Sequence, residues 1–436
     1  MSSWKEYKLG EIATFYNGRA YKNTEFKVSG TPIVRIQNLT GEGKIVYSDL
    51  NLDENKYIDY GDLIYAWSAT FGPYIWKGEK SIYHYHIWKI ICNEELLDKK
   101  YFYYKLKQIS DNLKDSGGNG SIFVHITKAF MENFKVKIPS LNEQKRVSSI
   151  LAYLDEKIQL NTQINQTLEQ IAQTIFKSWF IDFDPVHAKA NALASGQTAE
   201  QATQAAMAVI SGKNTQELHR LQTANPEQYQ QLWEIAEAFP SGFSGYKNLG
   251  EIPIGWNVLT FKDFISESKE KIGSLEDVPE YSVGNEGIYP RSEKYNKSLS
   301  KTPEKNKVVR IGDLVFGMGS KTLNWGIMND EIGSVSPAYF VYRIFTNINY
   351  IYLNKYIKAK EYDFQNLIKP TSRQGQSVDK EMFLKKEIYV PNEYLLNIYL
   401  NKLKEIDSLV YSYTTEVLIL EQIRDELLPK LLSGEI

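Results

Sequence analysis

The feature that most constrains the fold of this 436-residue chain is an internal duplication. The segment Gly-Asp-Leu-Ile-Tyr at residues 61–65 recurs as Gly-Asp-Leu-Val-Phe at residues 312–316. Further landmarks follow in the same order at offsets of 249 to 254 residues: Trp4 with Trp256, residues 88–90 with 342–344, 101–104 with 350–353, and 137–139 with 389–391. A repeat of this kind marks two copies of one structural unit, so the sequence predicts two similar modules.

Each module is expected to be a mixed, strand-rich domain followed by a long helix. The Gly-Asp pair is typical of a turn that leads into a buried apolar strand. Residues 83–91 and 338–345 are rich in aromatic and β-branched side chains, and they predict further strands. The expected class is therefore α+β, with two pseudo-repeated mixed α/β modules separated by an antiparallel two-helix coiled coil.

Both copies end at a proline, after which an apolar pattern of alternating steps of four and three residues begins. This is the spacing of a coiled-coil seam. The second seam, from Leu396 to Leu431, matches the first in length. Exposure of either seam to water would cost free energy, so we expect the two helices to pair with each other within the chain. The first seam consists of Val147, Leu151, Leu154, Ile158, Asn161, Asn165, Leu168, Ala172, Ile175 and Trp179.

Two polar residues, Asn161 and Asn165, interrupt the first seam. Buried asparagines in a seam fix the register of two helices at some cost in stability. The alternative is that both side chains face solvent where the seam is locally loosened, and the sequence leaves these two possibilities open.

The residues between the first helix and the second module differ in composition from both. Residues 199–210 and 226–238 predict short helices, which Gly196, Gly212 and Ser241-Gly242 interrupt. The predicted organisation has five parts: module 1 at residues 1–140, the central helix at 141–183, a helical spacer at 184–250, module 2 at 251–392 and the distal helix at 393–436.

Composition excludes several classes of protein. Cys92 is the single cysteine, so no intrachain disulfide can form, and with five scattered histidines the usual zinc spacings cannot be built. No run reaches the ~18 apolar residues of a membrane helix, and the first residues lack the apolar stretch of a signal peptide. The sequence therefore predicts a cytoplasmic protein without a membrane partner or a metal site.

The formal charge of −2 is distributed unevenly. By segment it is +3 for residues 1–140, −3 for 141–250, +2 for 251–392 and −4 for 393–436. Two mildly basic modules permit phosphate contacts at two places, but these values lie far below those of a strongly basic nucleic-acid-binding domain. Charge alone does not decide the function.

Four segments lie at the ends of the predicted helices and at the start of module 2: residues 141–147 (Leu-Asn-Glu-Gln-Lys-Arg-Val), 180–186 (Phe-Ile-Asp-Phe-Asp-Pro-Val), 250–256 (Gly-Glu-Ile-Pro-Ile-Gly-Trp) and 427–434 (Leu-Leu-Pro-Lys-Leu-Leu-Ser-Gly). Together they resemble the DNA-specificity (S) subunits of type I restriction-modification enzymes. The resemblance covers the whole chain in the order of the family. The second helix departs from it, because Asn392-Glu393-Tyr394 follows Pro391 and the Glu-Gln pair is missing.

The resemblance implies two target recognition domains held apart by the helix pair, each reading one part of a split target in double-stranded DNA. It also implies two methyltransferase subunits that dock on this chain, and restriction/translocation subunits that join the larger complex. The chain itself is then a non-catalytic subunit of an adenine methyltransferase/endonuclease complex, without a cofactor. The seam from Val147 to Trp179 would measure about 50 Å as a helix, enough to separate two readers by a helical turn of DNA or more.

Three segments look catalytic, but their patterns are incomplete. Residues 317–322 (Gly-Met-Gly-Ser-Lys-Thr) lack the glycine before the lysine that a phosphate-binding loop requires. Residues 336–339 (Ser-Pro-Ala-Tyr) lack the second proline of the amino-methyltransferase loop and favour a turn at the start of a strand. His84 and His86 would share one strand face without a third metal ligand nearby, which favours DNA contact or simple exposure.

Base reading requires hydrogen-bonding side chains on exposed loops. Arg373, Gln374 and Gln376 are the strongest candidates, because arginine pairs naturally with guanine and glutamine with adenine. The full set of predicted DNA-binding residues is Arg35, Gln37, Asn38, Trp67, Ser68, Thr70, Asn119, Ser121, Asn285, Arg291, Ser320, Lys321, Asn324, Arg373, Gln374 and Gln376.

Two other classes of function compete with this hypothesis. A coiled-coil interaction scaffold without sequence-specific DNA binding would not need duplicated polar loops. A self-contained DNA-modifying enzyme would need a further cofactor-binding domain, for which two modules and a spacer leave no room.

Overall fold

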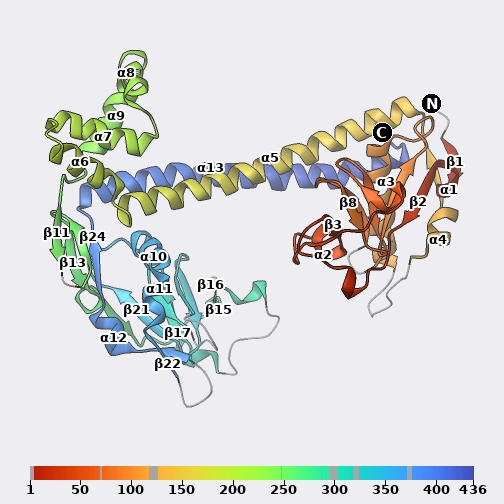
Figure 1. The fold of residues 1–436 in the computed structure, drawn as a ribbon. Helices are drawn as coiled ribbons and strands as arrows, with labels where there is room; N and C mark the ends of the chain where they lie inside the picture. The colour runs from red at the N-terminus through yellow and green to blue at the C-terminus, as the bar shows by residue number, and fades with distance from the viewer. Residues whose placement is uncertain are drawn as a thin grey trace. The chain divides into compact units, whose positions relative to one another are not determined.

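The chain divides into two units, each built from segments distant in sequence. The computed structural model describes residues 4–68, 71–116, 126–246, 248–285, 287–294, 302–317, 324–370 and 376–436. Unit 1 comprises residues 1–165 and 411–436, and unit 2 comprises residues 166–410. Each unit therefore combines one module with part of both long helices (Figure 1).

Two four-stranded sheets form the centre of module 1. The first is antiparallel with the order β2-β9-β6-β7, and in the second, with the order β4-β3-β8-β5, strands β3 and β8 run parallel. A separate antiparallel pair joins β1 to β10. The strands are β1 Lys5–Lys8, β2 Ala13–Asn17, β3 Thr31–Val34, β4 Val46–Ser48, β5 Tyr57–Ile58, β6 Leu63–Ala66, β7 Gly72–Ile75, β8 Ser81–Tyr83, β9 Ile87–Cys92 and β10 Lys135–Ile138.

The apolar run of β6 is buried on both faces. Leu63 and Tyr65 pack into a core with the long helix of the module, whereas Ile64 packs between the two sheets with Val34 and Tyr83. A strand covered on both sides needs continuous apolar sequence, as predicted. The helices of module 1 are α1 Leu9–Ile12, α2 Ile36–Leu39, α3 Lys99–Ser116 and α4 Lys128–Asn133, with 3-10 turns at Asn23–Glu25 and Glu54–Lys56.

Module 2 repeats the first of these sheets and the flanking strand pair, whereas its other strands form the two-stranded pairs β15-β16, β17-β20 and β22-β23. Its four-stranded sheet has the order β14-β21-β18-β19, which corresponds strand for strand to β2-β9-β6-β7, and β13 pairs with β24 as β1 does with β10. The strands are β13 Asn257–Thr260, β14 Ile265–Ser268, β15 Tyr281–Gly284, β16 Gly287–Pro290, β17 Lys307–Arg310, β18 Leu314–Phe316, β19 Trp325–Ile327, β20 Ile332–Val335, β21 Phe340–Ile344, β22 Ile368–Pro370, β23 Gln376–Val378 and β24 Glu387–Val390.

The burial pattern repeats as well. In β18, Leu314 and Phe316 join the large core of unit 2, while Val315 packs in a second core between the smaller strand pairs. A parallel bridge from Glu280 to Ser334 takes the place of the parallel β3-β8 pairing. The helices are α10 Tyr350–Ala359, α11 Glu361–Gln365 and α12 Lys380–Lys385, with 3-10 turns at Phe261–Asp263, Arg291–Glu293 and Pro303–Lys305.

The duplicated Gly-Asp pair forms the same turn in both modules. Gly61 and Gly312 have φ angles of 85° and 83°, in the left-handed region that glycine tolerates best. The aspartate that follows accepts a hydrogen bond from the backbone N–H three residues earlier, at 2.8 Å in Asp62 and 2.9 Å in Asp313. This landmark of the repeat therefore has a structural role.

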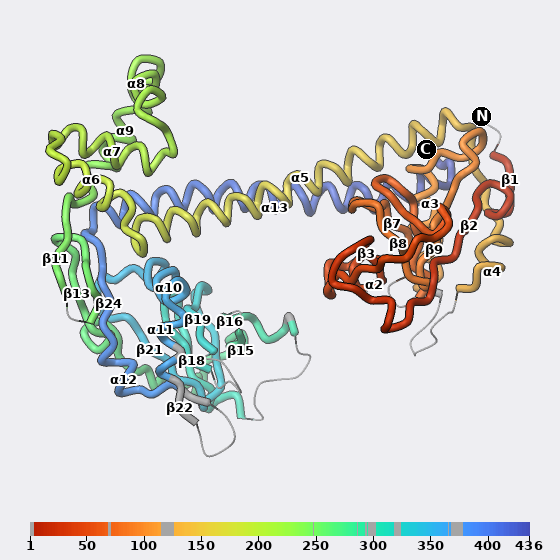
Figure 2. Tube along the Cα trace, viewed as in Figure 1, coloured from red at the N-terminus to blue at the C-terminus, as the bar shows by residue number. Residues whose placement is uncertain are grey.

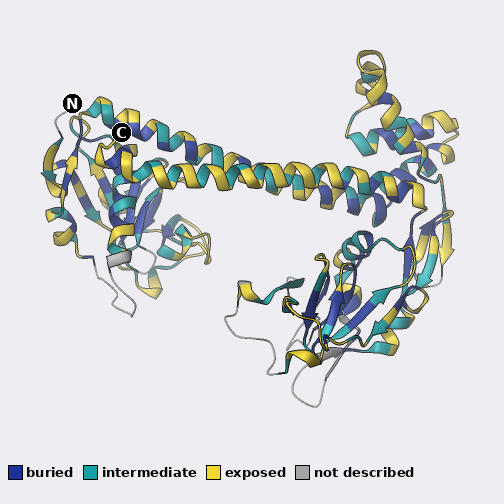
Figure 3. Cartoon of the chain, turned by 180° about the vertical axis from the view of Figure 1, so that it is seen from behind, coloured by how far each residue is buried: buried dark blue, intermediate teal, exposed yellow. Residues whose placement is uncertain are grey.

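The two predicted long helices are present as α5, Leu141–Phe180, and α13, Glu393–Ser433. Every predicted seam position on both helices is buried or half-buried. Within unit 1, Asp155 pairs with Arg424 at 3.2 Å and Lys157 with Glu416 at 3.6 Å, so the two helices run antiparallel there (Figure 2). Outside the seam, the helix surfaces are largely exposed (Figure 3).

The two seam asparagines lie in the helix interface rather than in solvent. Asn161 is fully buried, and neither polar atom of its side chain has a hydrogen-bond partner among the described residues. Asn165 donates its Nδ2 to Thr414 Oγ1 of α13 at 3.0 Å. Of the two possibilities left open by the sequence, the structure favours buried polar groups within the seam.

The spacer forms four helices: α6 Asp184–Ala194, α7 Ala199–Ser211, α8 Thr215–Ala224 and α9 Pro226–Glu237. Thr198 and Asn214 cap α7 and α8 in capping boxes, and Lys189 donates to the carbonyl groups of Ala236 and Phe239 at the end of α9. A hairpin of β11, Phe243–Tyr246, and β12, Gly250–Pro253, leads into module 2.

The end of one long helix packs on the tryptophan that opens each module. In unit 2, Phe180 and Phe183 contact the ring of Trp256 at centroid distances of 5.9 Å and 5.4 Å. In unit 1, a Cβ added to Gly434, just after α13, would lie 2.6 Å from the ring of Trp4, so only glycine fits. Three of the four segments that carry the family resemblance, at residues 180–186, 250–256 and 427–434, therefore contribute to this packing.

Candidate functional site

The predicted DNA-binding residues of module 1 that the structure describes gather at one edge of the module. Strands β3 and β8 run parallel and end together, and the backbone N–H of His84 donates to Val34 O at 2.9 Å. Strand β6 ends at the same edge, where the N–H of Trp67 donates to His86 O at 3.1 Å. We call this the turn edge of module 1, defined by residues 35–38, 67–68 and 84–86.

A prediction about this edge was wrong. Residues 83–91 were expected to form one strand, but the structure breaks it at residues 84–86, which form a turn between β8 and β9. The break has a topological cause, because β8 belongs to one sheet and β9 to the other, so the chain must cross between them. The two imidazoles therefore lie on a turn, with ring centroids 4.9 Å apart, rather than on a strand face.

The segment of residues 35–38 is tied down by its own hydrogen bonds. Arg35 donates its Nη2 to Lys44 O at 2.8 Å, and its backbone N–H donates to Asn38 Oδ1 at 3.0 Å. Asn38 in turn donates its Nδ2 to Gly43 O at 3.3 Å. The side chain of Gln37, on the short helix α2, is exposed. These bonds hold the loop in one conformation.

The remaining residues of this edge are aromatic. Trp67 donates its Nε1 to Tyr85 O at 2.8 Å, and its ring lies 5.1 Å from that of His86, centroid to centroid. Ser68, next to it, is half-buried. Sequence reasoning considered the two histidines as DNA contacts but did not include them or Tyr85 in the predicted site. Three consecutive rings between two apolar runs were the signal that could have found them.

Module 2 has a corresponding turn edge, defined by residues 285, 317, 324 and 336–339. Asn285 follows β15, and the N–H of Gly317, directly after β18, donates to Asn324 O at 2.8 Å. Residues 336–339 form the turn before β21, as their sequence predicted, and Lys307 donates its Nζ to Tyr339 O at 2.6 Å. Asn285 also lines a small cleft of about 120 Å³ with Asn354.

Arg291 does not join this edge. It lies at the other end of the β15-β16 hairpin, where its backbone N–H donates to Glu280 O at 2.7 Å and its Nη1 donates to Ser282 Oγ at 3.1 Å. Gln376 begins β23, paired with Pro370. The predicted residues Thr70, Asn119, Ser121, Ser320, Lys321, Arg373 and Gln374 lie outside the described residues.

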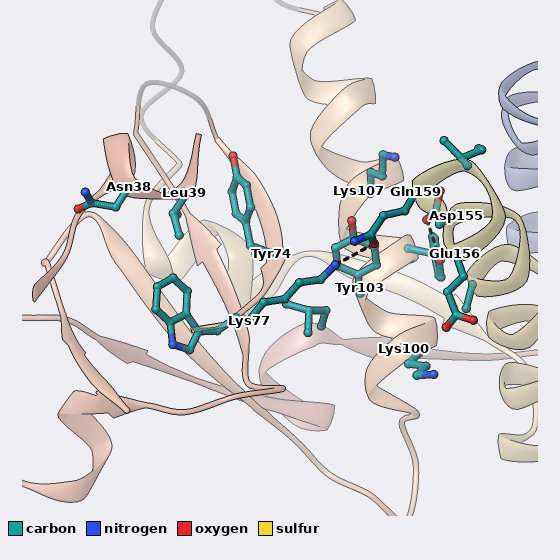
Figure 4. Close-up of a pocket in the computed structure, with 15 residues that line it drawn as sticks. Asn38, Leu39, Tyr74, Lys77, Lys100, Tyr103, Lys107, Asp155, Glu156 and Gln159 are labelled. Atoms are coloured by element: carbon teal, nitrogen blue, oxygen red, sulfur yellow. Dashed lines mark hydrogen bonds between the residues drawn. The ribbon is translucent and has the colours of Figure 1, made fainter. Parts of the chain in front are cut away.

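A cleft of about 610 Å³ opens within unit 1 between module 1 and helix α5 (Figure 4). Lys77 reaches across it and donates to Gln159 Oε1 at 3.0 Å. Lys100 and Lys107, seven residues apart on α3, also line it. On the helix wall, Asp155 accepts a hydrogen bond from the Tyr104 hydroxyl at 2.8 Å, and burial and this carboxylate both raise the pKa of Tyr104.

The start of helix α5 is anchored by Gln144, which is fully buried. Its Nε2 donates to Leu96 O and Pro139 O, both at 2.9 Å, and its Oε1 accepts from the backbone N–H of Asp98 at 2.9 Å. All of these bonds lie inside unit 1. The Gln of the Glu-Gln pair thus holds the helix to its module, whereas Asn392 only caps α13.

Within the described part of the chain, no group of three His, Cys, Asp or Glu side chains is placed to hold a metal ion. In the same residues, no helix combines the length and apolar character needed to cross a membrane.

The model of the family "Type I restriction modification DNA specificity domain" matches residues 1–170. The type I restriction enzyme HindI specificity subunit of Haemophilus influenzae is 31% identical to this chain over 483 aligned positions, which cover 100% of both chains. The EcoBI specificity subunit of Escherichia coli is 25% identical over 180 positions, 40% of this chain and 38% of that protein.

Among solved structures, the type-I restriction-modification S subunit from M. genitalium aligns with 99% of this chain and 96% of its own, at 12% identity and a TM-score of 0.49. The full-length match to the Haemophilus protein decides the family. This chain belongs to the specificity subunits of type I restriction-modification systems.

Proposed function

We propose that this chain supplies the DNA sequence specificity of a type I restriction-modification complex, with each module reading one part of a split target in double-stranded DNA. One observation carries the proposal. Two modules of equal strand order each bring polar and aromatic side chains together at the ends of equivalent strands. Rigid strands that end in variable turns are a common way to present side chains to base edges.

In this proposal, the antiparallel pair of α5 and α13 holds the two readers apart and sets the gap between the half-sites. The lengths of 40 and 41 residues and the buried seam positions support a stiff pair. The buried polar groups of Asn161 and Asn165 would keep the helices in one register.

Two methyltransferase subunits are the proposed partners of the helix pair and the modules. Large apolar side chains stay exposed on the outer faces of the helices in unit 1, including Tyr153, Leu160, Tyr411 and Leu418. Tyr411 is 75% exposed, and several large apolar side chains exposed on one helix pair are typical of a surface that a partner covers. The cleft beside Lys77 lies next to this surface, with Gln159 in its wall.

The chemistry would belong to the partners. Methyl transfer to adenine would take place in the methyltransferase subunits, and cleavage in restriction/translocation subunits that join the complex. This chain would contribute recognition and assembly and would need no cofactor of its own. The acidic segments at residues 141–250 and 393–436, with charges of −3 and −4, would face basic surfaces of the partners, so moderate salt should weaken assembly.

Binding-site selection with the assembled methyltransferase complex tests the proposal. We expect a motif of two short sequences separated by a gap of fixed length. A complex that selects no motif, or a single uninterrupted one, would contradict it. The alternative, a coiled-coil scaffold without DNA binding, predicts that a gel shift with the complex shows no preference between DNA sequences.

A further inference from the structure

We propose that the turn of residues 84–86, His84-Tyr85-His86, is the part of module 1 that contacts base edges in the major groove. The inference rests on the proposed function and makes it specific, because it assigns one half of the target to one turn. It extends the predicted site by three residues that lie between the two predicted loops, at Arg35 and at Trp67.

Five hydrogen bonds fix the backbone of this turn, one of which is the bond from the N–H of Trp67 to His86 O described above. The N–H of His84 donates to Val34 O at 2.9 Å, that of Tyr85 to Arg19 O at 3.0 Å and that of Ile87 to His84 O at 2.9 Å. From the side, the indole of Trp67 donates to Tyr85 O at 2.8 Å. A reading element must hold its side chains in place before DNA arrives, and these bonds provide that order.

The turn presents a cluster of rings. The centroid of the Tyr85 ring lies 4.4 Å from that of His84 and 3.9 Å from that of His86, and the ring of Trp67 lies 6.1 Å from that of Tyr85. Tyr85 is 39% exposed, whereas Tyr83, two residues earlier, is fully buried in the core between the sheets. The exposed ring is thus supported by neighbouring rings rather than by the hydrophobic core.

The chemistry of His84 suits bases better than phosphates. Burial, followed by the nearby His86 and Arg35, lowers the pKa of His84 to about 4, so its imidazole is neutral at physiological pH. A neutral imidazole offers one hydrogen-bond donor and one acceptor. In the major groove, adenine presents an acceptor and a donor side by side, whereas a phosphate presents acceptors only.

Two arginines near the turn make hydrogen bonds within the protein. Arg19 binds Glu25 with both terminal nitrogens, at 2.7 Å and 3.1 Å. Arg35 donates its Nη2 to a backbone carbonyl group. Glu25 therefore neutralises Arg19, which removes one cation that could have anchored a DNA phosphate beside the turn.

The equivalent turn of module 2 has different chemistry. Residues 336–339 read Ser-Pro-Ala-Tyr and contain no imidazole, and Lys307 donates to the carbonyl group of Tyr339. The two turns therefore should read different bases. This difference provides a matched control, because a change in one turn should leave the half-site of the other unaltered.

The test is binding-site selection with the full methyltransferase complex, carrying either His84→Ala or Tyr85→Ala. If an alanine variant lowers the melting temperature, a milder variant takes its place: His84→Gln for His84→Ala, and Tyr85→Phe for Tyr85→Ala. Tyr60→Ala serves as a control within module 1, since this 76% exposed tyrosine lies at the opposite ends of the strands. Tyr339→Ala is the reciprocal control in module 2, because a change in that turn should leave the half-site read by module 1 unaltered.

We expect the His84 and Tyr85 variants to lose at least about fivefold in enrichment at one or more positions of one half-site, with the other half-site and the gap unchanged. The Tyr60 variant should select the wild-type motif. If the His84 and Tyr85 variants select the wild-type motif, the inference about this turn is overturned, while the proposed function of the chain is not. Weaker binding with an unchanged motif would overturn it as well, because that result would indicate a phosphate contact. If the wild-type complex selected no motif at all, the proposed function itself would fail.

Discussion

Modules 1 and 2 share a scaffold but differ at the edge where the strands end. The strand orders β2-β9-β6-β7 and β14-β21-β18-β19 correspond, and the turn at Asp62 repeats at Asp313. At the turn edge, module 1 carries three consecutive rings, whereas module 2 carries a proline-containing turn. The segments that repeat maintain the fold, and in our proposal the segments that diverge determine which bases are read.

The ion pairs at the repeated turn also differ in depth. Asp62 is 25% exposed and pairs with Lys89 at 2.9 Å. Asp313 is 1% exposed and pairs with both Nε and Nη2 of Arg343, which also reaches Glu270. A planar guanidinium can bridge two carboxylates in a fixed geometry, which an ammonium group cannot. Module 2 therefore relies more strongly on this turn than module 1 does.

The largest expected effect is that of Asp313→Ala. This change leaves Arg343 without its most buried partner and should lower the free energy of unfolding by about 3 kcal/mol. Asp62→Ala removes a more exposed pair and should cost only about 1 kcal/mol. Thermal unfolding of the two variants measures the difference. Equal losses would show that the two turns are energetically equivalent and that the asymmetry between the modules is only geometric.

The starts of the two long helices provide the next comparison. Gln144→Ala leaves the N–H of Asp98 and the carbonyl groups of Leu96 and Pro139 without this partner, and we expect a loss of about 2 kcal/mol. Glu143→Ala, which removes an exposed pair with Arg146, should cost less than about 1 kcal/mol. Denaturant unfolding tests both variants. A Gln144 variant as stable as the Glu143 variant would remove the structural explanation of the Glu-Gln pair.

A smaller effect is expected in the seam, and it has the opposite sign. Asn161→Leu replaces a buried amide that lacks a partner among the described residues and should stabilise the protein by about 1 kcal/mol. Asn165→Leu breaks the bond to Thr414 and should gain less. Melting temperatures of the two variants test this. A destabilised Asn161 variant would indicate that the side-chain amide of Asn161 is hydrogen-bonded in the folded protein in solution.

A further predicted effect is the dependence of stability on pH that His84 gives to module 1, and no histidine contributes in the same way in module 2, because residues 251–392 contain none. The pKa of His84 is about 4 in the folded chain and about 6.5 when unfolded, so between these values the unfolded chain binds more protons. Stability should therefore fall as the pH drops from 6.5 towards 4. His84→Gln should lack this contribution. As the pH falls from 6.5 towards 4, the melting temperature of the variant should therefore rise relative to that of the wild type. A constant difference would contradict the lowered pKa.

Sequence patterns predicted the parts of the fold that depend on periodic burial. The seams of α5 and α13 could be found because their side chains alternate regularly between the helix interface and the surface. The strands at Leu63 and Leu314 could be found because they are buried on both faces and therefore read as short continuous apolar runs. The break at residues 84–86 could not be found this way. It arises because β8 and β9 belong to different sheets, which is a property of the topology rather than of local propensity.

The candidate site was predicted only in part, for a related reason. Arg35 and Trp67 were identified from their residue types, but their common edge depends on the parallel pairing of β3 with β8 and on the end of β6. Arg291 has the same kind of side chain as Arg35, yet the β15-β16 hairpin carries it to the other end. Residue type indicates what a side chain can bind, and only the strand order determines which side chains can bind together.

The most direct test of two independent readers on one scaffold is methylation profiling of DNA from cells that express this chain with its methyltransferase partners, compared with cells that express the Tyr85→Ala chain. We expect methylated adenines within a two-part sequence of fixed gap, and a change confined to one part in the variant. Methylation at an uninterrupted sequence, or a variant that alters both parts together, would contradict the independence of the two modules.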